Sequence, residues 1–315
     1  DKCLAGVHAQ TFQDFKTVVV DNGSSDGSPD LIEDAYPWVH LIRLPRNFGF
    51  CRANNIALEM CNSDYAALLN NDAIPDKDWL YQLVSALEKN PDAGFCASKM
   101  LYHDRPHVID RAGDGYTTAG AGLLHGRGLK DDQFYQKPWI FGASAGAAIY
   151  RMSMLMDIGF FDEDFFLIYE DVDLSFRAQL FGYNCAYVPE AVVYHLATRS
   201  IGYDSPTAVY YGHRNLEWVY FKNMPWRLLI ITAVNHTIYN WVAFLYFSIN
   251  GHAKTYTRAK TDAIKSMKVI MKKRAQIQSR RKRGDRELWR LFNRELLLNR
   301  FTNRLKANRE STIHS

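Results

Sequence analysis

Three carboxylates interrupt an apolar and aromatic stretch in this chain of 315 residues. Residues 165–177 read F-F-L-I-Y-E-D-V-D-L-S-F-R and contain Glu170, Asp171 and Asp173. An ionised carboxylate in apolar surroundings is costly unless a cation, a metal ion or hydrogen-bond donors meet it. Asp173 has a plain explanation, because Arg177 follows at the four-residue spacing of a helical ion pair. Glu170 and Asp171 could face the positive end of a helix dipole, but we favour catalytic roles because a second acidic cluster lies upstream.

Polar residues end several apolar runs of the sequence. Asp21 follows the run at 17–20, the cluster N-N-D at 70–72 follows a run that ends at Leu69, and His195 follows the run at 191–194. Ligands of open α/β sheets bind at the carboxyl ends of the strands. The sequence therefore predicts one site to which separate strands contribute side chains.

Asp72 and His195 suit a divalent metal ion. A hard ion such as Mg²⁺ or Mn²⁺ accepts one or two carboxylates and often a phosphate, and Mn²⁺ also tolerates imidazole. Taken singly, Asp72 could be a turn or N-cap residue, and His195 a surface histidine with satisfied hydrogen bonds. The prediction of a metal site therefore depends on the two residues occurring together with the other polar strand ends.

Strand-like and helix-like runs alternate along the first hundred residues. We expect strands at 17–20, 40–44, 65–69 and 94–100, helices at 28–36, 49–61 and 79–89, and two later short strands at 185–188 and 191–194. This alternation predicts an α/β fold with a mostly parallel, Rossmann-like sheet and flanking helices. Residues 103–138 are glycine-rich and weakly patterned, and we expect a long variable loop or small insertion there. The small residues at 141–150 would let backbone approach a ligand or let a strand pack closely on a helix.

Composition places the chain in the globular class, since 47% of its residues are hydrophobic and 14% aromatic. The five cysteines are scattered, odd in number and without a C-x-x-C pair, so we expect reduced thiols in a cytosolic compartment. The first ten residues carry no basic region followed by an apolar run, so no signal peptide is expected. They also lack an initiator Met, and a strand is expected to be missing upstream.

Charge and hydropathy set the C-terminal part of the chain apart. Residues 251–315 contain 19 Lys and Arg against 5 Asp and Glu, a net charge of +14; subtraction from 38 and 34 leaves 19 against 29, or −10, for residues 1–250. Just before this tail, residues 228–249 contain no formal charge, a length that permits a membrane span. Asn235, His236 and Asn240 interrupt the run, so we favour interfacial or hairpin-like contact with an anionic membrane surface over a clean span. Nucleic acid is the less favoured partner for the tail, because aromatic residues are sparse there.

Eight motifs, in order along residues 8–222, resemble those of the inverting family 2 glycosyltransferases with the GT-A fold, in particular their rhamnosyltransferase-like bacterial branch. They are V-V-V-D-N-G-S-S-D-G-S at 18–28, N-F-G-F-C-R-A-N-N at 47–55, L-L-N-N-D-A at 68–73, G-A-S-A-G-A-A at 142–148, the acidic stretch F-D-E-D-F-F-L-I-Y-E-D-V-D-L-S-F-R at 161–177, G-Y at 182–183, V-P-E-A-V-V-Y-H at 188–195 and H-R-N at 213–215. One such string would be weak, whereas eight in the family's order make the resemblance specific.

The resemblance implies a role for each matching residue. For the donor, Asp21 would meet the nucleobase, Asn47, Gly49 and Asn54 would line the nucleotide pocket, and Asp72 and His195 would hold Mn²⁺ or Mg²⁺ on the diphosphate. For the acceptor, Gly142, Ala143 and Gly146 would form the wall of its site, and Asp171 would be the general base, with Glu170 beside it. Asn71 and Arg214 would also bind substrate. The pair Asn70-Asn71 departs from the family's pattern, because many relatives carry Asp or Pro-Asp there.

The implied activity is the transfer of a sugar from a nucleotide-diphosphate sugar, dTDP-rhamnose or a UDP-sugar, to a hydroxyl of a glycan or lipid-linked acceptor. A single displacement inverts the configuration and needs no activated Ser or Cys. The alternatives are a nucleotidyltransferase and a non-catalytic, membrane-associated nucleotide-sugar-binding module. We expect a glycosyltransferase domain at 1–222, membrane-interacting helices at 223–250 and a basic helical tail at 251–315, located on the cytoplasmic side of the membrane and with no nucleic-acid partner.

Overall fold

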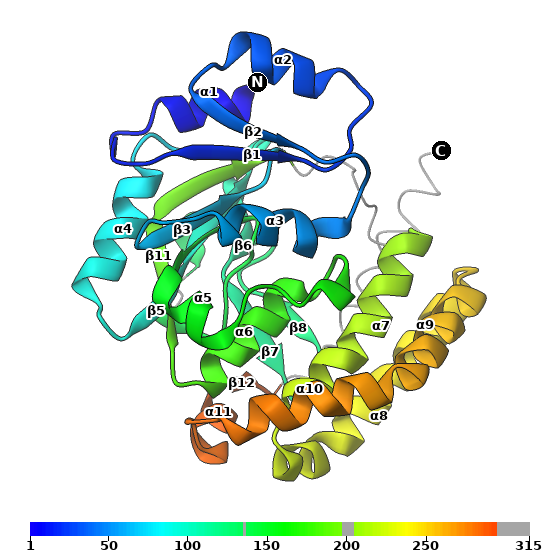
Figure 1. Cartoon of the computed structure of the whole chain (residues 1–315). Coiled ribbons are helices and arrows are strands. Elements are labelled where there is room, and N and C mark those ends of the chain that lie inside the picture. Colours follow the sequence, from blue (N-terminus) through cyan, green and yellow to red (C-terminus); the bar gives the residue numbers. More distant parts are fainter. Residues whose placement is uncertain (135–136, 197–204, 295–315) are drawn as a thin grey trace. The chain divides into compact units, whose positions relative to one another are not determined.

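The structure is a computed structural model that describes residues 1–134, 137–196 and 205–294 (Figure 1). Its contacts divide the chain into unit 1, residues 1–114 and 124–198, and unit 2, residues 115–123 and 199–315. The boundaries predicted at residues 222 and 250 remain predictions, and the predicted tail from residue 295 onward lies outside the described residues.

Unit 1 begins with a small two-stranded sheet and its helices. The elements are α1 (Lys2–His8), β1 (Thr17–Asp21), α2 (Ser28–Ala35), β2 (Val39–Arg43) and α3 (Gly49–Glu59). β1 and β2 pair in parallel, from Thr17 opposite Val39 to Asp21 opposite Arg43. The loops that follow the two strands therefore leave the sheet at the same edge, as the apolar runs predicted.

A larger mixed sheet forms the core of unit 1. Its order is β3 (Tyr65–Leu69), β10 (Ala147–Arg151), β5 (Ala93–Tyr102), β11 (Asn184–His195) and β4 (Ala73–Pro75), with β6 (Arg105–Ala112) on β5 and β9 (Trp139–Ile140) on β11. The helices of this part are α4 (Trp79–Lys89), α5 (Met152–Ile158) and α6 (Glu170–Leu180), with short 3₁₀ turns at η1 (Asp131–Gln133) and η2 (Glu163–Phe165). Buried side chains of α4, including Leu83 and Leu87, pack on the apolar residues of β5, β10 and β11.

The α/β class is confirmed, but the large sheet has more antiparallel pairs than the sequence predicted. β5 and β11 are parallel, whereas β10 pairs antiparallel with both β3 and β5, and β4 and β9 pair antiparallel with β11. The two short strands expected at 185–188 and 191–194 are one strand, β11. A register shift between Val188 and Val192 interrupts its pairing with β5, and the exposed Pro189 and Glu190 in between produced the apparent break.

Of the two expectations for 103–138, a long variable loop or a small insertion, the loop is wrong. This segment contains β6, the strands β7 (Asp114–Thr117) and β8 (Gly122–Leu124), and η1. β6 turns back and pairs antiparallel with β5, with an irregular register: Leu101 lies opposite Ile109, and Met100 lies opposite Arg111. Asp110 is therefore the extra residue of a bulge, and it breaks the two-residue alternation by which a strand is recognised.

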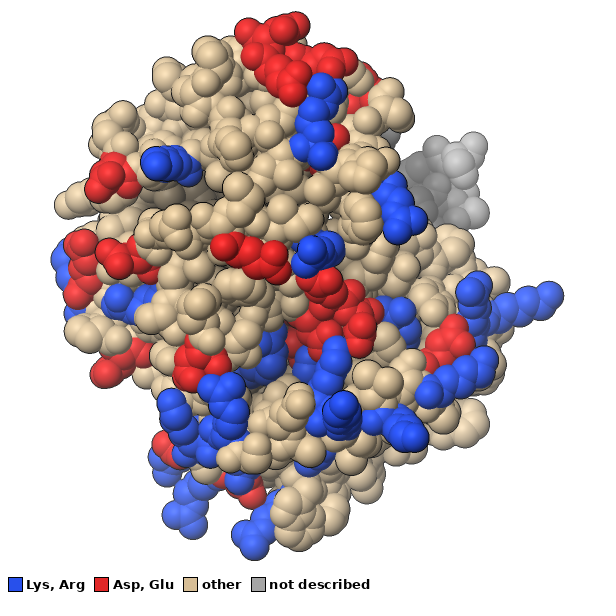
Figure 2. All heavy atoms as spheres, viewed as in Figure 1, with Lys and Arg blue, Asp and Glu red and all other residues tan. Residues whose placement is uncertain are grey.

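Unit 2 is mainly helical. Its elements are α7 (Pro206–Asn223), α8 (Trp226–Ile249), α9 (Ala253–Lys265), α10 (Met267–Ser279), α11 (Asp285–Leu291) and β12 (Phe292–Asn293), which pairs with β7. Pro at the first turn and the side chain of Ser205, which accepts from the N–H of Ala208, begin α7. Figure 2 shows Lys and Arg side chains gathered over the region that α10 and α11 occupy in Figure 1.

Helix α8 has two faces. One face is buried and consists of Leu228, Thr232, His236, Tyr239, Ala243, Tyr246 and Phe247. The other face is an exposed apolar row, which we name the α8 stripe: Trp226, Ile230, Ile231, Val234, Ile238, Trp241, Leu245 and Ile249. By length and composition α8 could cross a membrane, although 28% of its most apolar part is buried within the protein.

Candidate active site

The residues just before α6 have a backbone conformation that residues other than glycine rarely adopt. Phe166, Ile168 and Tyr169 have φ angles of 65°, 64° and 74°, in the left-handed region. Such conformations cost of order 1–3 kcal/mol each and cluster at functional sites. Their effect here is to place Glu170 and Asp171 in the first turn of α6, where the helix dipole favours negative charge.

Asp171 is held by the backbone and by one guanidinium. The N–H of Val172 donates to its Oδ1 over 2.8 Å, and Nη1 of Arg111 lies 3.5 Å from its Oδ2. Burial raises the pKa of Asp171, while the charge of Arg111 and the N–H groups of Val172 and Ala145 oppose the rise. The net result is a carboxylate that binds a proton more tightly than an exposed Asp does, which suits a general base near neutral pH.

Two more carboxyl groups lie in the same electrostatic environment. Asp114 is 3% exposed, its Oδ2 lies 3.3 Å from Arg111 Nη1, and burial raises its pKa to about 7. Glu170 is 8% exposed, and burial followed by the charge of Asp171 raises its pKa to about 8. Its Oε2 is buried without a hydrogen-bond partner among the described residues. These carboxyl groups therefore share protons near neutral pH and titrate as a coupled group.

Asp72 and His195 meet as the sequence predicted. Asp72 directly precedes β4, which pairs with β11, and Nε2 of His195 lies 3.4 Å from Oδ2 of Asp72. Nδ1 of His195 lies 2.8 Å from Oδ2 of Asp110, and hydrogen bonds to Asp110 and Asp72 raise the pKa of His195 to about 9. Burial opposes ionisation of Asp110, but His195 and Arg127 hold its pKa well below the ordinary value.

The donor set fits a divalent ion whose other ligands come from substrate. Among the described residues, Oδ1 of Asp72 is buried without a hydrogen-bond partner, so this carboxylate has unused capacity beside the imidazole. Within residues 1–134, 137–196 and 205–294 no group of three or more His, Cys, Asp or Glu side chains is arranged to hold a metal. Two protein ligands plus diphosphate oxygens are a normal arrangement for Mg²⁺ at a phosphate substrate.

The two halves of the site meet on β6. Asp110 contacts His195 and the next residue, Arg111, contacts Asp171. Successive residues of a regular strand point to opposite faces, and the bulge at Asp110 is the local feature that re-aims them. Asp110, Arg111, Asp114 and Arg127 were all missed by the sequence analysis, because they lie in the segment expected to be a loop. The motif D-R-A-G-D at 110–114 was the available signal, since it alternates acid and base beside a glycine.

The predicted nucleotide residues lie at the end of β1 (Asp21), in the loop after β2 (Asn47) and in α3 (Gly49 and Asn54). Asn22 joins the loops: its Nδ2 donates to Asn47 Oδ1 and to the carbonyl of Gly49, both over 3.1 Å. Asp21 accepts from the N–H of Ser24 over 3.0 Å, so its Oδ1 shapes its own turn. Asn54 donates to the carbonyl of Phe50, within α3. Asn71 is exposed beside Asp72.

Gly49 connects this region to the start of α6. Its φ is +85°, and a Cβ there would lie 2.5 Å from Cδ2 of Phe166. The N–H of Phe50 donates to the carbonyl of Phe166 over 2.7 Å. A side chain at Gly49 would therefore push against the strained segment that places Glu170 and Asp171.

The predicted acceptor wall packs against both Asp114 and α6. Gly142 and Asp114 exchange two backbone hydrogen bonds, of 2.8 and 3.0 Å. A Cβ at Gly142 would lie 2.5 Å from Oγ of Ser175, and this hydroxyl accepts from the N–H of Ala143 over 3.4 Å. At the other end, the carbonyl of Gly146 accepts from the N–H of Asn70. Close packing thus accounts for Gly142, and the contact of this wall with an acceptor remains a prediction.

Arg214 belongs to unit 2 and is described there only. It lies on α7 with its guanidinium 4.0 Å from the ring centre of Trp218, and its Nε donates to Asn215 Oδ1. Its predicted role in substrate binding remains a prediction.

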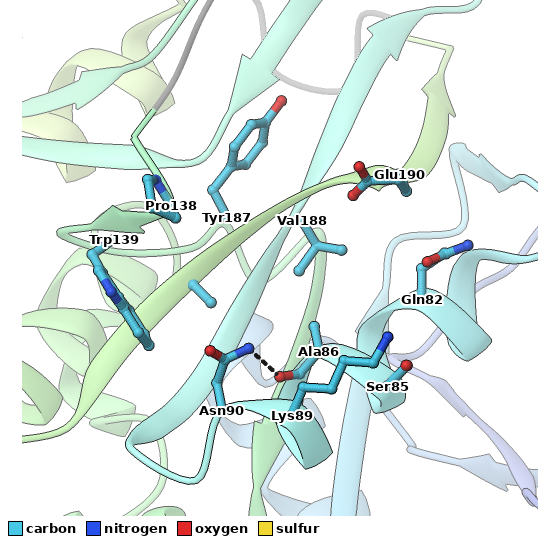
Figure 3. A pocket seen from close by; sticks show the side chains of 11 residues that line it. Gln82, Ser85, Ala86, Lys89, Asn90, Pro138, Trp139, Tyr187, Val188 and Glu190 are labelled. Carbon is cyan, nitrogen blue, oxygen red and sulfur yellow. Dashed lines mark hydrogen bonds between the residues drawn. The ribbon is translucent and has the colours of Figure 1, made fainter.

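A cavity of about 540 Å³ in unit 1 lies away from these groups (Figure 3). Residues of α4, β9 and β11 line it, among them Lys89, Asn90, Trp139 and Glu190. A second cavity, of about 450 Å³, is lined by residues around β1 and β2 such as His8 and Trp38. None of the predicted catalytic, metal or substrate residues lines either cavity, so the site is recognised by its chemistry and not by its concavity.

Comparison with solved structures identifies the fold as GT-A. GalNAc-T7, solved with UDP, GalNAc and Mn²⁺, has a TM-score of 0.55 at 14% identity, over 69% of this chain and 44% of that one. A mannosyltransferase from Pyrobaculum calidifontis, solved with GDP-Man and Mn²⁺, has a TM-score of 0.53 at 17% identity, over 87% of this chain and 79% of that one.

The sequence model of glycosyl transferase family 2 matches residues 1–159, just over half of the chain. The chain therefore belongs to glycosyl transferase family 2, and the resemblance inferred from its motifs is confirmed. An N-acetylglucosaminyl-diphospho-decaprenol L-rhamnosyltransferase of Mycobacterium tuberculosis is 26% identical over 249 residues, 68% of this chain and 77% of the relative. A poly-beta-1,6-N-acetyl-D-glucosamine synthase of Staphylococcus epidermidis is 24% identical over 202 residues, 63% of this chain and 47% of the relative. The match to an uncharacterised Sinorhizobium fredii protein spans 22% of that protein, so the chain covers less than half of two of these relatives.

The buried carboxyl of Glu170 generates a prediction about stability. Its folded-state pKa lies above the unfolded value of 4.5, so folding takes up a proton and wild-type stability falls as the pH rises from about 4.5 to about 8. Glu170→Gln removes this cost. We expect the variant's Tm to exceed that of the wild type by about 3–8 °C at pH 8.5 and to approach it at pH 5, as measured by calorimetry.

The exposed Glu190 offers a matched control for this prediction. Glu190→Gln removes a carboxylate that is already in water, so its Tm difference from the wild type should not depend on pH. A Glu170→Gln variant with the same pH-independent behaviour would contradict the assignment of a protonated, buried Glu170.

Proposed function

We propose that this chain is an inverting glycosyltransferase that moves a sugar from a nucleotide-diphosphate sugar to a hydroxyl of a glycan or lipid-linked acceptor. The observation that carries the proposal is Asp171, a carboxylate at the start of α6 with a raised pKa, next to the 142–146 segment through the N–H of Ala145. A base in this position could accept the proton of a hydroxyl bound at the 142–146 segment. The solved structures that share this fold contain nucleotides and Mn²⁺.

The reaction is a single displacement. Asp171 accepts the proton of the acceptor hydroxyl as the oxygen bonds to the anomeric carbon, and the bond from that carbon to the diphosphate oxygen breaks. The nucleoside diphosphate leaves with both electrons of that bond, and the configuration inverts. Arg111 keeps Asp171 oriented and moderates its proton affinity through the contact at 3.5 Å.

Asp72 and His195 would hold Mn²⁺ or Mg²⁺ on the diphosphate. A divalent ion there offsets the negative charge that develops on the leaving group. Asp21 at the end of β1, Asn47 in the loop after β2 and Gly49 at the start of α3 would receive the nucleoside. Both solved relatives contain Mn²⁺, which supports a divalent ion in this chain as well.

The donor class follows from the relatives in part. A rhamnosyltransferase and an N-acetylglucosamine polymer synthase are among them, and they support dTDP-rhamnose or a UDP-sugar as the donor. The same relatives support an acceptor that is a lipid-linked or growing cell-surface glycan. A panel of dTDP- and UDP-sugars, scored for turnover with Mn²⁺, tests the donor directly.

We propose further that unit 2 attaches the enzyme to the cytoplasmic face of an anionic membrane through the α8 stripe. The buried face of α8 carries His236, whose Nε2 lies 3.0 Å from Glu217 Oε2 on α7, and Lys260 of α9 lies 2.5 Å from the other oxygen of Glu217. A helix with one face in contact with charged side chains is poorly suited to a position in which lipid surrounds it completely. Lying in the interface, α8 would insert only its stripe, and the basic residues after 250 would meet anionic headgroups.

Asp171→Asn should reduce sugar transfer by at least ~10²-fold, because the amide cannot accept the acceptor's proton. Binding of the donor, measured by calorimetry with Mn²⁺, should remain near the wild-type value, since the base acts on the acceptor. Asp164→Asn, an exposed carboxylate of the same segment, should change neither property. Near-normal turnover of Asp171→Asn would show that another group is the base.

Asp72→Ala should weaken metal-dependent donor binding more than His195→Ala does, because the carboxylate also neutralises charge. If both residues contact one ion, the loss of donor-binding free energy in the double variant should be smaller than the sum of the losses in the two single variants. Titration of donor with Mn²⁺ and with EDTA measures this dependence. Additive losses, or full activity in excess EDTA, would argue against the shared ion.

Polar substitution of the α8 stripe should release the protein from membranes. Ile230→Gln, Val234→Gln and Trp241→Gln, combined in the full chain, should strongly reduce sedimentation with anionic vesicles. High salt should weaken wild-type binding, because exposed charges are screened beyond about 10 Å at ~0.1 M. Met156→Gln, at a residue of unit 1 that is 72% exposed, serves as the control. Extraction that needs detergent and ignores salt would instead indicate a span.

A further inference from the structure

His195 is held by two groups on its two ring nitrogens. Nε2 faces Asp72 Oδ2 at 3.4 Å, and Nδ1 faces Asp110 Oδ2 at 2.8 Å. The second contact is the shorter one, and Asp110 is 3% exposed. A hydrogen bond at Nδ1 opposes rotation of the imidazole about the Cβ–Cγ bond. Asp110 therefore determines where Nε2 points.

Asp110 is itself held in place. Its Oδ1 accepts from Nη2 of Arg127 over 2.5 Å, and Nε of Arg127 donates to the hydroxyl of Tyr102 over 3.1 Å. Both oxygens of Asp110 are thus engaged, one by the arginine and one by the histidine. The carboxylate sits at the bulge of β6, opposite the last part of β5.

We propose that Asp110 and Arg127 are positioning residues for metal binding: Asp110, oriented by Arg127, keeps the Nε2 lone pair of His195 directed at the ion shared with Asp72. This inference rests on the proposed function and deepens it. In metal sites, a carboxylate that accepts from the second nitrogen of a ligating imidazole fixes the ring and raises its basicity. Neither residue belongs to the motifs that carry the family resemblance.

A purely structural ion-pair cluster is the competing explanation, because Asp110 also pairs with Arg127. In that case the loss of Asp110 would lower stability without a specific effect on the ion. Asp72 argues for the positioning role, since its Oδ2 faces Nε2, the ring nitrogen that Asp110 does not contact, and its Oδ1 is buried without a hydrogen-bond partner among the described residues.

The test measures Mn²⁺ affinity in the full chain, by the loss of the free-ion EPR signal, with and without UDP. Asp110→Asn should weaken Mn²⁺ binding about 10- to 100-fold, and Arg127→Met should weaken it less, since Asp110 remains. UDP affinity in EDTA should be unchanged for both variants. Asp131→Asn, which removes a carboxylate paired with Lys99 at 2.9 Å, is the control for loss of an ion pair in the same segment.

The double variant separates positioning from stability. If Asp110 acts through the imidazole, Asp110→Asn should add no further loss of Mn²⁺ affinity in a His195→Ala background. A full additional loss there, or wild-type affinity in Asp110→Asn alone, would overturn the proposal and leave the proposed function intact. If the wild-type chain binds no Mn²⁺ even with UDP, the metal part of the proposed function fails and this inference fails with it.

Arg127→Met keeps the test decisive if Asp110→Asn does not fold. Melting curves in EDTA identify that case, because a destabilised variant has a lowered Tm without metal. A folded Arg127→Met variant with unchanged Mn²⁺ affinity would then contradict the orientation of Asp110 by Arg127, whereas a moderate loss with unchanged UDP affinity in EDTA supports it.

Discussion

The guanidinium of Arg111 is the interaction on which the acidic site depends. It contacts Asp114 at 3.3 Å and Asp171 at 3.5 Å, and Glu170 lies in the same buried environment. One cation cannot neutralise three buried carboxylates, so burial is compensated in part by protons that Asp114 and Glu170 retain near neutral pH. The cost of burial thus becomes useful, because the same desolvation that opposes ionisation raises the proton affinity of the proposed base.

A single irregularity in β6 lets one short segment serve both halves of the site. Without the bulge at Asp110, Asp110 and Arg111 would point to opposite faces of a strand, and only one of them could reach the site. With it, Asp110 meets His195 while Arg111 meets Asp171. The proposed metal-binding side and the proposed base are therefore linked through adjacent residues of β6, so a shift of β6 would move both.

Regular periodicity made most of the α/β framework predictable. α4 was expected at its observed bounds, and the ends of β3 and β11 placed Asp72 and His195 correctly because buried strands end abruptly in polar residues. The family resemblance predicted roles for Asp171 and Glu170, and their acidic side chains in an apolar stretch also made them candidates; these roles remain predictions. Asp110, Arg111 and Asp114 could not be found in this way, because their burial depends on partners distant in sequence and their strand lacks alternation. The antiparallel pairing of β10 could not be predicted either, because an apolar run does not indicate whether a strand pairs in parallel or antiparallel.

Charge patterning explains why α8 was ambiguous in sequence. An uncharged run of this length fits a span, yet its polar residues recur on one face, where His236 and Asn240 join Glu217 and Lys260. Burial lowers the pKa of Lys260, and the contact with Glu217 opposes that effect. Breaking this network to surround α8 with lipid would leave buried charges unpaired. The same polar residues that interrupt the apolar run therefore favour a helix that stays on unit 2 and offers its stripe to a surface.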